Sequence, residues 1–147
     1  MKHFALIPFA LLLACGEVAP GPDYLPDGAA PLFQLRSVDG APAAAGMSLE
    51  FSTEGQVSGN GPCNSFAGTQ AGVYPAFSAP RLNVTERACD RLDVEADYLA
   101  ALTGMTQAAL TTEGDLILTG GGRQMTFAPA PVAAIIGEPL PAEAQQP

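Results

Sequence analysis

Two cysteines, Cys63 and Cys89, are the residues of this chain best suited to covalent chemistry. Cys63 lies in the glycine-rich stretch GNGPCNSFAG (59–68), and Cys89 follows 26 positions later, flanked by Arg87 and Arg91. Basic neighbours favour a reactive thiolate, but neither cysteine belongs to a C-x-x-C motif, and two cysteines form a poor metal site without histidine. We therefore predict a structural disulfide, with a redox pair or two free thiols as the alternatives.

The third cysteine, Cys15, directly follows a short apolar run. Residues 1–14, MKHFALIPFALLLA, have a positive start at Lys2 and an apolar middle. Such a run is too short to span a bilayer, which takes about 20 apolar residues, and is typical of a secretory signal peptide. The sequence LLAC that ends at Cys15 resembles the lipobox of bacterial lipoproteins, whose cysteine is lipidated and becomes the first mature residue. We expect lipidation of Cys15; an ordinary signal cleaved elsewhere and a buried N-terminal strand are the alternatives.

Lipidation would make the acyl chains the contact with the membrane. Stable anchoring takes more than one acyl chain, a condition that the triacylated cysteine of a lipoprotein meets. Residue 16 is Gly rather than the Asp associated with inner-membrane retention. We therefore expect the periplasmic face of the outer membrane, within a bacterial cell envelope. That compartment is oxidising, as a disulfide between Cys63 and Cys89 requires.

Charge and composition exclude several classes of function. The full chain has a net charge of −9, and removal of residues 1–14 takes away its only Lys and its only His, leaving five Arg against fifteen acidic residues. An acidic chain without a basic stripe does not suit nucleic acid or anionic headgroups. Without His or Lys there is no Ser-His-Asp triad, Cys-His dyad, Schiff base or His-built zinc site. We expect a protein that is not an enzyme and has no cofactor and no metal.

Composition divides the chain into a signal peptide (1–14), a Pro- and Gly-rich tether (15–31), a folded domain (32–128) and a Pro-rich tail (129–147). We expect the tether to be extended rather than packed. The apolar cluster at residues 132–136 leaves two interpretations for the tail: a short strand or helix packed on the domain, or a loose segment.

Six segments of the domain alternate apolar and polar residues with the period of two that is typical of half-buried strands. Their apolar positions are Phe33/Leu35, Leu49/Phe51, Val57, Leu82/Val84, Leu116/Leu118 and Met125/Phe127. Glu54-Gly55 and the triplet 120–122 predict tight turns between consecutive strands, since glycine accepts positive φ without penalty.

One segment, residues 90–110, has helical spacing instead. Its apolar stripe consists of Leu92, Tyr98, Leu99, Leu102, Met105 and Ala109. Asp90 or Asp93 can cap the start of the helix. Asp90, Asp93 and Asp97 share one face, which we interpret as solvated rather than as a calcium site. The expected fold is α+β, a small, curled antiparallel sheet of about six to seven strands with one amphipathic helix packed on it.

The ordered strings GQVSG (55–59), CNSFAG (63–68) and TERAC (85–89), followed by an acidic helix and a G-x-L-x-L hairpin, resemble the META domain, also called HslJ-like. The resemblance covers about residues 32–128. It implies a small α+β domain of bacterial envelope proteins, often lipoproteins, without an established catalytic activity. The motif residues are Gly59, Asn64, Gly68 and Thr85. We interpret Asn64 as an Asx-type turn former, with ligand contact as the alternative.

Three functions from different classes remain. The first is a monomeric, non-catalytic envelope lipoprotein that binds an unknown envelope protein or supports envelope integrity under stress. The second is a small-molecule or hydrophobic-ligand binding protein, which a sizeable apolar pocket would favour. The third is an enzyme or redox protein, which the missing catalytic side chains disfavour. We favour the first.

Overall fold

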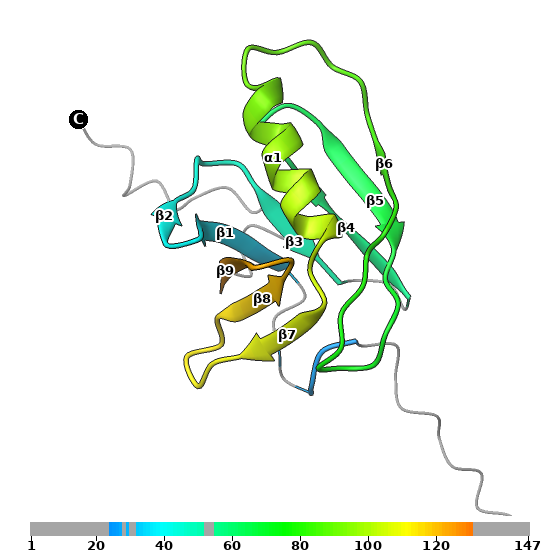
Figure 1. The fold of residues 1–147 in the computed structure, drawn as a ribbon, viewed down its shortest axis with the longest axis vertical. Helices are drawn as coiled ribbons and strands as arrows, with labels where there is room; N and C mark the ends of the chain where they lie inside the picture. The colour runs from blue at the N-terminus through cyan, green and yellow to red at the C-terminus, as the bar shows by residue number, and fades with distance from the viewer. Residues whose placement is uncertain (1–23, 28, 30–31, 52–54, 131–147) are drawn as a thin grey trace, which may run out of the picture.

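Nine β-strands and one α-helix form the part of the chain that the computed structural model describes, residues 24–27, 29, 32–51 and 55–130 (Figure 1). In chain order the elements are β1 (Leu32–Val38), β2 (Ala41–Pro42), β3 (Ser48–Glu50), β4 (Gln56–Asn60), β5 (Ser65–Thr69), β6 (Leu82–Val84), α1 (Leu92–Thr103), β7 (Gln107–Leu110), β8 (Leu116–Gly120) and β9 (Arg123–Pro129). The α+β class is confirmed, and the number of strands is higher than predicted.

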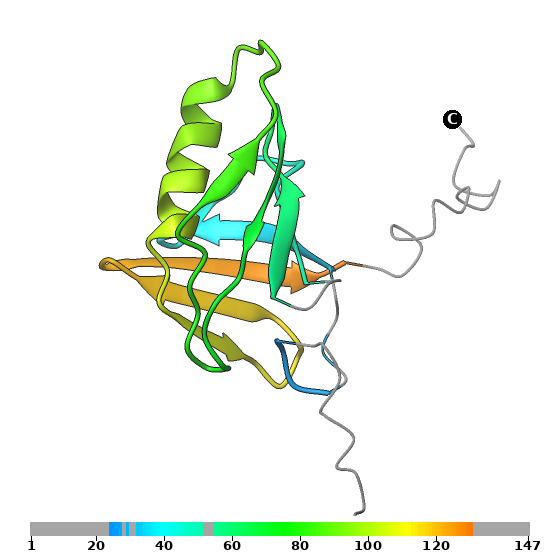
Figure 2. The same ribbon diagram turned by 90° about the vertical axis from the view of Figure 1, so that its right-hand side faces the viewer.

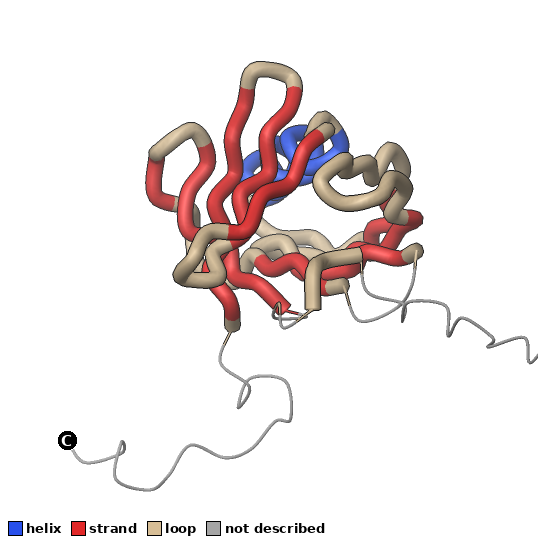
Figure 3. Tube along the Cα trace, turned by 90° about the horizontal axis from the view of Figure 1, so that it is seen from below, coloured by secondary structure: helices blue, strands red, loops and turns tan. Residues whose placement is uncertain are grey.

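The strands form one antiparallel sheet in the order β6-β5-β4-β3-β1-β9-β8-β7, with β2 attached to β1. The first and last strands are therefore neighbours, paired through Leu35 and Phe127. The register shifts between Leu35 and Ser37, and an irregularity of this kind increases the bend of a strand. The sheet curls, and α1 lies on its concave side (Figure 2). Seen from below, the strands form a curved wall (Figure 3).

The concave face of the sheet carries the hydrophobic core. Side chains that are completely buried come from five strands: Phe33, Leu49, Val57, Leu116, Leu118, Met125 and Phe127. The helix adds Leu102 and Tyr98, whose hydroxyl donates a hydrogen bond to the Ser48 carbonyl at 2.9 Å. Complete burial of one such side chain stabilises the fold by about 1.5–3 kcal/mol relative to exposure. The core therefore decides which face of the sheet the helix covers.

Three strands, β2, β5 and β7, are not predicted by the sequence pattern. β2 has two residues, and β5 (SFAGT) has one large apolar residue, Phe66, so neither shows an alternation. β7 (QAAL) continues the helical spacing in the sequence, yet α1 ends at Thr103 and Gly104 caps it. The predicted helical stripe is therefore wrong at Met105, which follows the end of the helix, and at Ala109, which lies in β7.

The start of α1 also differs from the prediction. The N-cap residue is Arg91, and no side chain caps the helix, so neither Asp90 nor Asp93 plays that role. The first helical hydrogen bond runs from the Glu95 N–H to the Arg91 carbonyl at 3.1 Å.

The predicted turn at Gly120–Gly122 is confirmed. The β8–β9 pairing extends to Gly120 and Arg123, so Gly121 and Gly122 form a two-residue loop, both with positive φ of 58° and 77°. This conformation suits a hairpin and favours glycine at both positions. Gly55 also has a positive φ of 65°, whereas Glu54 lies outside the described residues.

The two edges of the sheet differ in their cover. The connection between β5 and β6 reaches β7 and pairs with it: the Phe77 N–H donates to the Thr106 carbonyl at 3.0 Å, and the Ala108 N–H donates to the Pro75 carbonyl at 2.8 Å. At the opposite edge, β6 has β5 as its neighbour in the sheet, and no second strand from the described residues pairs with it.

The predicted tether is packed near its C-terminal end. Leu25 is 6% exposed within the core, and the Tyr24 ring stacks on Phe51 with 5.4 Å between the ring centroids. The Tyr24 hydroxyl donates to the Ala76 carbonyl at 2.9 Å, and burial raises the pKa of Tyr24 to about 12. An extended, unpacked tether is therefore wrong for residues 24 and 25, because their large side chains gain more from the core than from water.

The folded unit extends past the predicted boundary at residue 128. β9 reaches Pro129, and the Ala130 N–H donates to the Leu32 carbonyl at 2.9 Å. Cys15 and the apolar cluster at residues 132–136 lie outside the described residues. No helix in the described part of the chain is long and apolar enough to cross a membrane.

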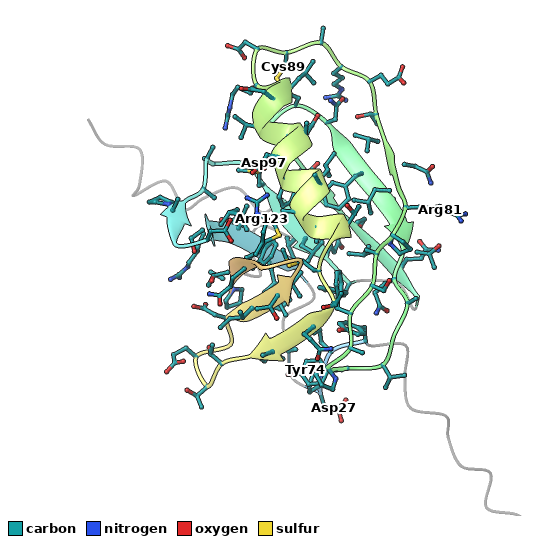
Figure 4. All side chains as sticks on the ribbon, viewed as in Figure 1. Asp27, Tyr74, Arg81, Cys89, Asp97 and Arg123 are labelled. Atoms are coloured by element: carbon teal, nitrogen blue, oxygen red, sulfur yellow. A yellow bond between two sulfur atoms is a disulfide. The ribbon has the colours of Figure 1, made fainter. Side chains whose placement is uncertain are left out.

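Arg123 at the start of β9 connects α1 to the β1–β2 turn (Figure 4). Its guanidinium donates to Asp39 at 2.9 Å and to both carboxylate oxygens of Asp97 on α1, at 2.9 and 3.1 Å. A hydrogen bond from the Gln124 N–H and then one from Arg123 lower the pKa of Asp39. The hydrogen bond from Arg123 also lowers the pKa of Asp97. Asp97 therefore has a bonding role on the helix face predicted to be solvated.

Arg123→Gln should reduce the loss of the free energy of unfolding that occurs at acid pH. Carboxyl groups with a lowered folded-state pKa stabilise the fold above their unfolded pKa of about 3.9 and lose that contribution as the pH falls through the folded pKa. In urea-unfolding curves we expect the wild type to lose more stability than the variant below about pH 4. The groups are exposed, so salt should reduce the difference. Arg36→Gln is the control, and equal acid losses in all three proteins would contradict the prediction.

Candidate functional site

The Cys63–Cys89 disulfide ties the β4–β5 turn to the segment that enters α1. The two Cα atoms are 5.9 Å apart, and the predicted pairing is confirmed. Cys89 lies at the N-terminal end of α1 (Figure 4), where its Sγ accepts a hydrogen bond from the Arg91 N–H at 3.4 Å. On the chain-entropy model, closing a loop of 26 residues stabilises the fold by about 3.5 kcal/mol. The bond therefore serves as a staple between these two segments.

A buried carboxylate, that of Glu95 on α1, lies against the disulfide-bearing turn. Glu95 is 4% exposed. Its Oε1 accepts hydrogen bonds from the N–H groups of Asn64 at 2.7 Å and Cys63 at 3.3 Å, and its Oε2 accepts one from Asn64 Nδ2 at 2.7 Å. A buried carboxylate without donors costs several kcal/mol. These three N–H groups therefore make the interior position of Glu95 tolerable.

Asn64, which is 5% exposed, extends the network to the segment after β6. Its Oδ1 accepts hydrogen bonds from the Arg87 N–H at 2.6 Å and from the Thr85 hydroxyl at 3.0 Å. Thr85 Oγ1 in turn accepts one from the Ser65 N–H at 3.2 Å. The motif residues Asn64 and Thr85 are thus in direct contact. The sequence predicts that Asn64 bonds to backbone groups of its own turn. Instead, its side chain accepts a hydrogen bond from the backbone N–H of Arg87, 23 residues away.

Gly59 and Gly68, the other two motif residues, lie in β4 and β5 outside this network. A Cβ at Gly59 would overlap the Ser48 carbonyl, and a Cβ at Gly68 would overlap the Arg81 carbonyl. Close approach of neighbouring backbone, rather than positive φ, is therefore what favours glycine at both positions. These residues shape the sheet beneath α1.

Glu95 is the central residue that the sequence reasoning misses. It lies three residues before Tyr98 and seven before Leu102, on the same buried stripe of α1. The predicted stripe includes Leu92 instead, which is 45% exposed. The sequence does contain one signal for Glu95, which is an acidic residue on the apolar stripe of a helix. A carboxylate buried at such a position needs hydrogen-bond donors from other segments. Its donor Asn64 is 31 residues away in the chain, so the sequence does not identify it.

The hydrogen bonds of this network join the β4–β5 turn, the segment after β6 and α1. Within the described ranges, every buried side-chain nitrogen or oxygen atom has a hydrogen-bond partner. The two sulfur atoms are bonded to each other. The same part of the chain contains no group of three or more His, Cys, Asp or Glu residues that could hold a metal ion.

A groove of about 520 Å³ opens beside this network, between α1 and the segment that follows β6. Its polar lining includes Asn64, Thr85, Glu86, Arg87 and Glu95, and its apolar lining consists of Val84, Ala88, Leu92, Ala96 and Leu99. Two of the apolar side chains are unusually open to solvent, Leu92 at 45% and Val84 at 37%. Exposed apolar side chains that line one groove beside a fixed polar network suit a binding surface.

Two further hollows are less suited to an apolar ligand. One of about 460 Å³ lies over β1 and β3 and is lined by several polar residues, among them Gln34, Ser48, Glu50 and Asn60. The other, of about 350 Å³, contains the ion-paired side chains of Asp39, Asp97 and Arg123. The groove beside α1 is therefore the candidate functional site.

Glu95→Gln should lower the free energy of unfolding by about 1–3 kcal/mol. The new amide places an N–H donor against one of the donors of Asn64, so a buried group loses its partner. Urea unfolding followed by circular dichroism measures the change. Asp93→Asn removes the same charge from an exposed position of α1 and should have little effect. Equal stability of the two variants would contradict the central role of Glu95.

Solved structures of other proteins share this fold. An NMR structure of a protein from Burkholderia xenovorans superposes with a TM-score of 0.57 at 23% identity, covering 84% of this chain and 99% of that one. A second NMR structure gives 0.55 at 24% identity, covering 69% and 90%. A crystal structure of a DUF4847 family protein from Bacteroides vulgatus gives 0.54 at 13% identity, covering 69% and 94%. At these identities the likeness concerns the fold alone.

Sequence comparison identifies the family. None of the curated proteins compared with the chain matches it. The family model of the META domain matches residues 30–132, which include every strand and the helix described above. The chain therefore belongs to the META domain family, as its Cys-Asn and Thr-x-x-Ala-Cys motifs predict.

Proposed function

We propose that this chain is a non-catalytic lipoprotein of the bacterial cell envelope that binds a partner protein through the groove beside α1. The observation that carries the proposal is the exposure of Leu92 and Val84 at the walls of the groove. Burial of apolar surface contributes about 25 cal/mol per Å² to association. The polar atoms of Asn64 and Glu95 are already bonded within the protein, so a partner does not have to satisfy them.

The absence of histidine and lysine after residue 14 is consistent with a binding role. The sequence beyond that point has no His and no Lys. The buried carboxylate of Glu95 accepts hydrogen bonds from Asn64 and Cys63, so both of its oxygens are already bonded within the protein. A role in envelope integrity or stress would follow from the partner that is bound.

The volume of the groove also favours a second candidate, a small apolar ligand. Ligand pockets commonly measure about 300–1,000 Å³ and bury most of the ligand surface. The groove, at about 520 Å³, falls within that range. Its walls are open to solvent at Leu92 and Val84, so much of a small ligand would stay exposed. A partner protein can cover these side chains from outside, and we therefore favour the partner.

Cys15 should be the lipid-bearing first residue of the mature protein, with the outer membrane as its destination. Mass spectrometry of the N-terminal peptide should show a cysteine carrying acyl chains, and Cys15→Ser should carry none. Recovery of the wild type in the outer-membrane fraction would support the sorting expected from Gly16. An unmodified wild-type N-terminus at another residue would contradict the anchor.

A photo-reactive amino acid in place of Leu92 should crosslink to a protein of defined mass in cells that produce the chain. The same group at Val73, which is 85% exposed and does not line the groove, should give no such adduct. Ala96→Arg, which places a long side chain in the groove without a helix breaker, should abolish the adduct from position 92. Absence of a groove-specific adduct would overturn partner binding at this site.

A further inference from the structure

β6 is an end strand of the sheet, and its main-chain groups show two different orientations. The Thr85 N–H donates to the Ser65 carbonyl of β5 at 3.0 Å. In an antiparallel pair, alternate residues bond to the same neighbour. Asn83 and Thr85 therefore bond toward β5, while the N–H and C=O groups of Leu82 and Val84 point to the outer side of the strand. No strand of the described chain pairs with that side.

The edge of the sheet at β7 is covered by another segment of the protein, whereas the described residues leave the edge at β6 uncovered. Backbone groups of Pro75 and Phe77 bond to the chain at and just before β7 and cover that edge. An uncovered edge strand is a template for another strand, and proteins commonly block such edges. At β6, Val84 and residues of α1 line the same groove, and no described residue pairs with the outward main-chain groups of Leu82 and Val84.

An apolar stripe of α1 lies beside this open edge. Leu92, Ala96 and Leu99 are spaced i, i+4 and i+7, so they share one face of the helix. All three line the groove together with Val84. A strand added to β6 would run about 4.8 Å from it and would direct every second side chain to the α1 side of the sheet. The groove would then hold those side chains.

We propose that the groove receives an extended segment of another protein, which adds to the outer edge of β6 as a further strand and places alternate apolar side chains against α1. The inference rests on the proposed function and specifies how the partner is held. In strand addition, main-chain hydrogen bonds give affinity and side-chain pockets give specificity. Here Leu82 and Val84 supply the hydrogen-bonding groups, and the α1 stripe supplies the pocket.

Charge specifies the segment further and disfavours a second copy of this chain. Arg81 directly precedes β6, Arg87 lies three residues beyond its end next to Glu86, and both ion pairs of the described residues involve Arg123 instead. Figure 4 shows Arg81 projecting away from the sheet, where an acidic residue of the partner would meet it. Self-pairing centred on Val84 would bring Arg81 of one copy toward Arg87 of the other, between two chains of net charge −9.

A displayed library with about six randomised residues, the length of a typical strand, is the probe for selection against the purified mature protein. Selected peptides should carry apolar residues at alternate positions and an acidic residue between them. In NMR spectra of the labelled protein, a selected peptide should slow hydrogen exchange of the Leu82 and Val84 amides. The Asn83 and Thr85 amides, already bonded to β5, should change little. Failure to select a binder, or binding without this alternating protection, overturns the proposal.

Val84→Pro and Val84→Ala separate main-chain pairing from side-chain contact. Proline removes the outward N–H and is tolerated on an edge strand whose N–H faces solvent. Alanine keeps the N–H and shortens the side chain. We expect Val84→Pro to weaken the selected peptide at least about tenfold, and Val84→Ala to weaken it less. Equal affinities of the two variants overturn strand addition. Amide protection in the wild type provides the test if Val84→Pro does not fold.

Two further outcomes separate this inference from the proposed function. If the crosslink from position 92 persists in a Val84→Pro background, partner binding stands and strand addition fails. If the wild type gives no groove-specific crosslink, the proposed function fails, whether or not a peptide binds in vitro. Protection of the Leu82 and Val84 amides on concentrating the protein alone would identify a second copy as the occupant and overturn the partner segment.

Discussion

The buried carboxylate of Glu95 fixes how α1 sits on the sheet. Apolar contacts hold the helix against the core but are non-directional, so they tolerate small rotations and shifts. Hydrogen bonds have narrow preferences in distance and angle. Glu95 must meet the N–H groups of Asn64 and Cys63, and Asn64 must at the same time meet Arg87 and Thr85. One asparagine and one glutamate therefore align the β4–β5 turn, the segment after β6 and the helix.

The disulfide and the carboxylate constrain the same corner in different ways. The Cys63–Cys89 bond restricts the unfolded chain, whereas the Glu95 network is made only in the folded state. The disulfide limits the distance between the β4–β5 turn and the start of α1. The hydrogen bonds of Glu95 and Asn64 fix the orientation of these two segments, which the disulfide alone leaves free. The polar side of the groove is consequently well defined, and its apolar rim carries the exposed side chains. Leu92 at 45% exposure adds little to the core, so its apolar character is not explained by the fold.

Sequence periodicity predicts the elements that have their own local signal. β1, β8 and β9 alternate clearly, and Gly121 and Gly122 suit a two-residue hairpin loop. The count and position of Cys63 and Cys89, together with the oxidising compartment expected from the N-terminal sequence, predict the staple. Long-range contacts decide the rest. β7 has a helical spacing and becomes a strand because β8 and the segment around Pro75 offer it main-chain partners.

The candidate site is predictable only in part. Asn64 and Thr85 stand out in the sequence as motif residues, but their joint role depends on a loop that returns 21 residues later to the same point. The role of Glu95 is not predicted, because an acidic residue in the first turn of a helix is usually interpreted as solvent-exposed and as favourable to the helix dipole. Tyr24 and Leu25 are hidden because proline-rich surroundings indicate a tether. In each case a local pattern with a common interpretation is overridden by tertiary packing.

The open edge of β6 follows from the use of a helix as the cover of a curled sheet. A helix can bury an apolar face, but its main-chain groups are already bonded to each other, so it cannot pair with a strand. Where the β5–β6 connection covers the opposite edge, backbone pairs with backbone. Beside α1, the outward groups of Leu82 and Val84 have no such partner among the residues that the structure describes. The edge is short, since β6 spans Leu82–Val84 and Pro80 precedes it closely. A short edge limits open-ended assembly while still offering a place for one defined strand.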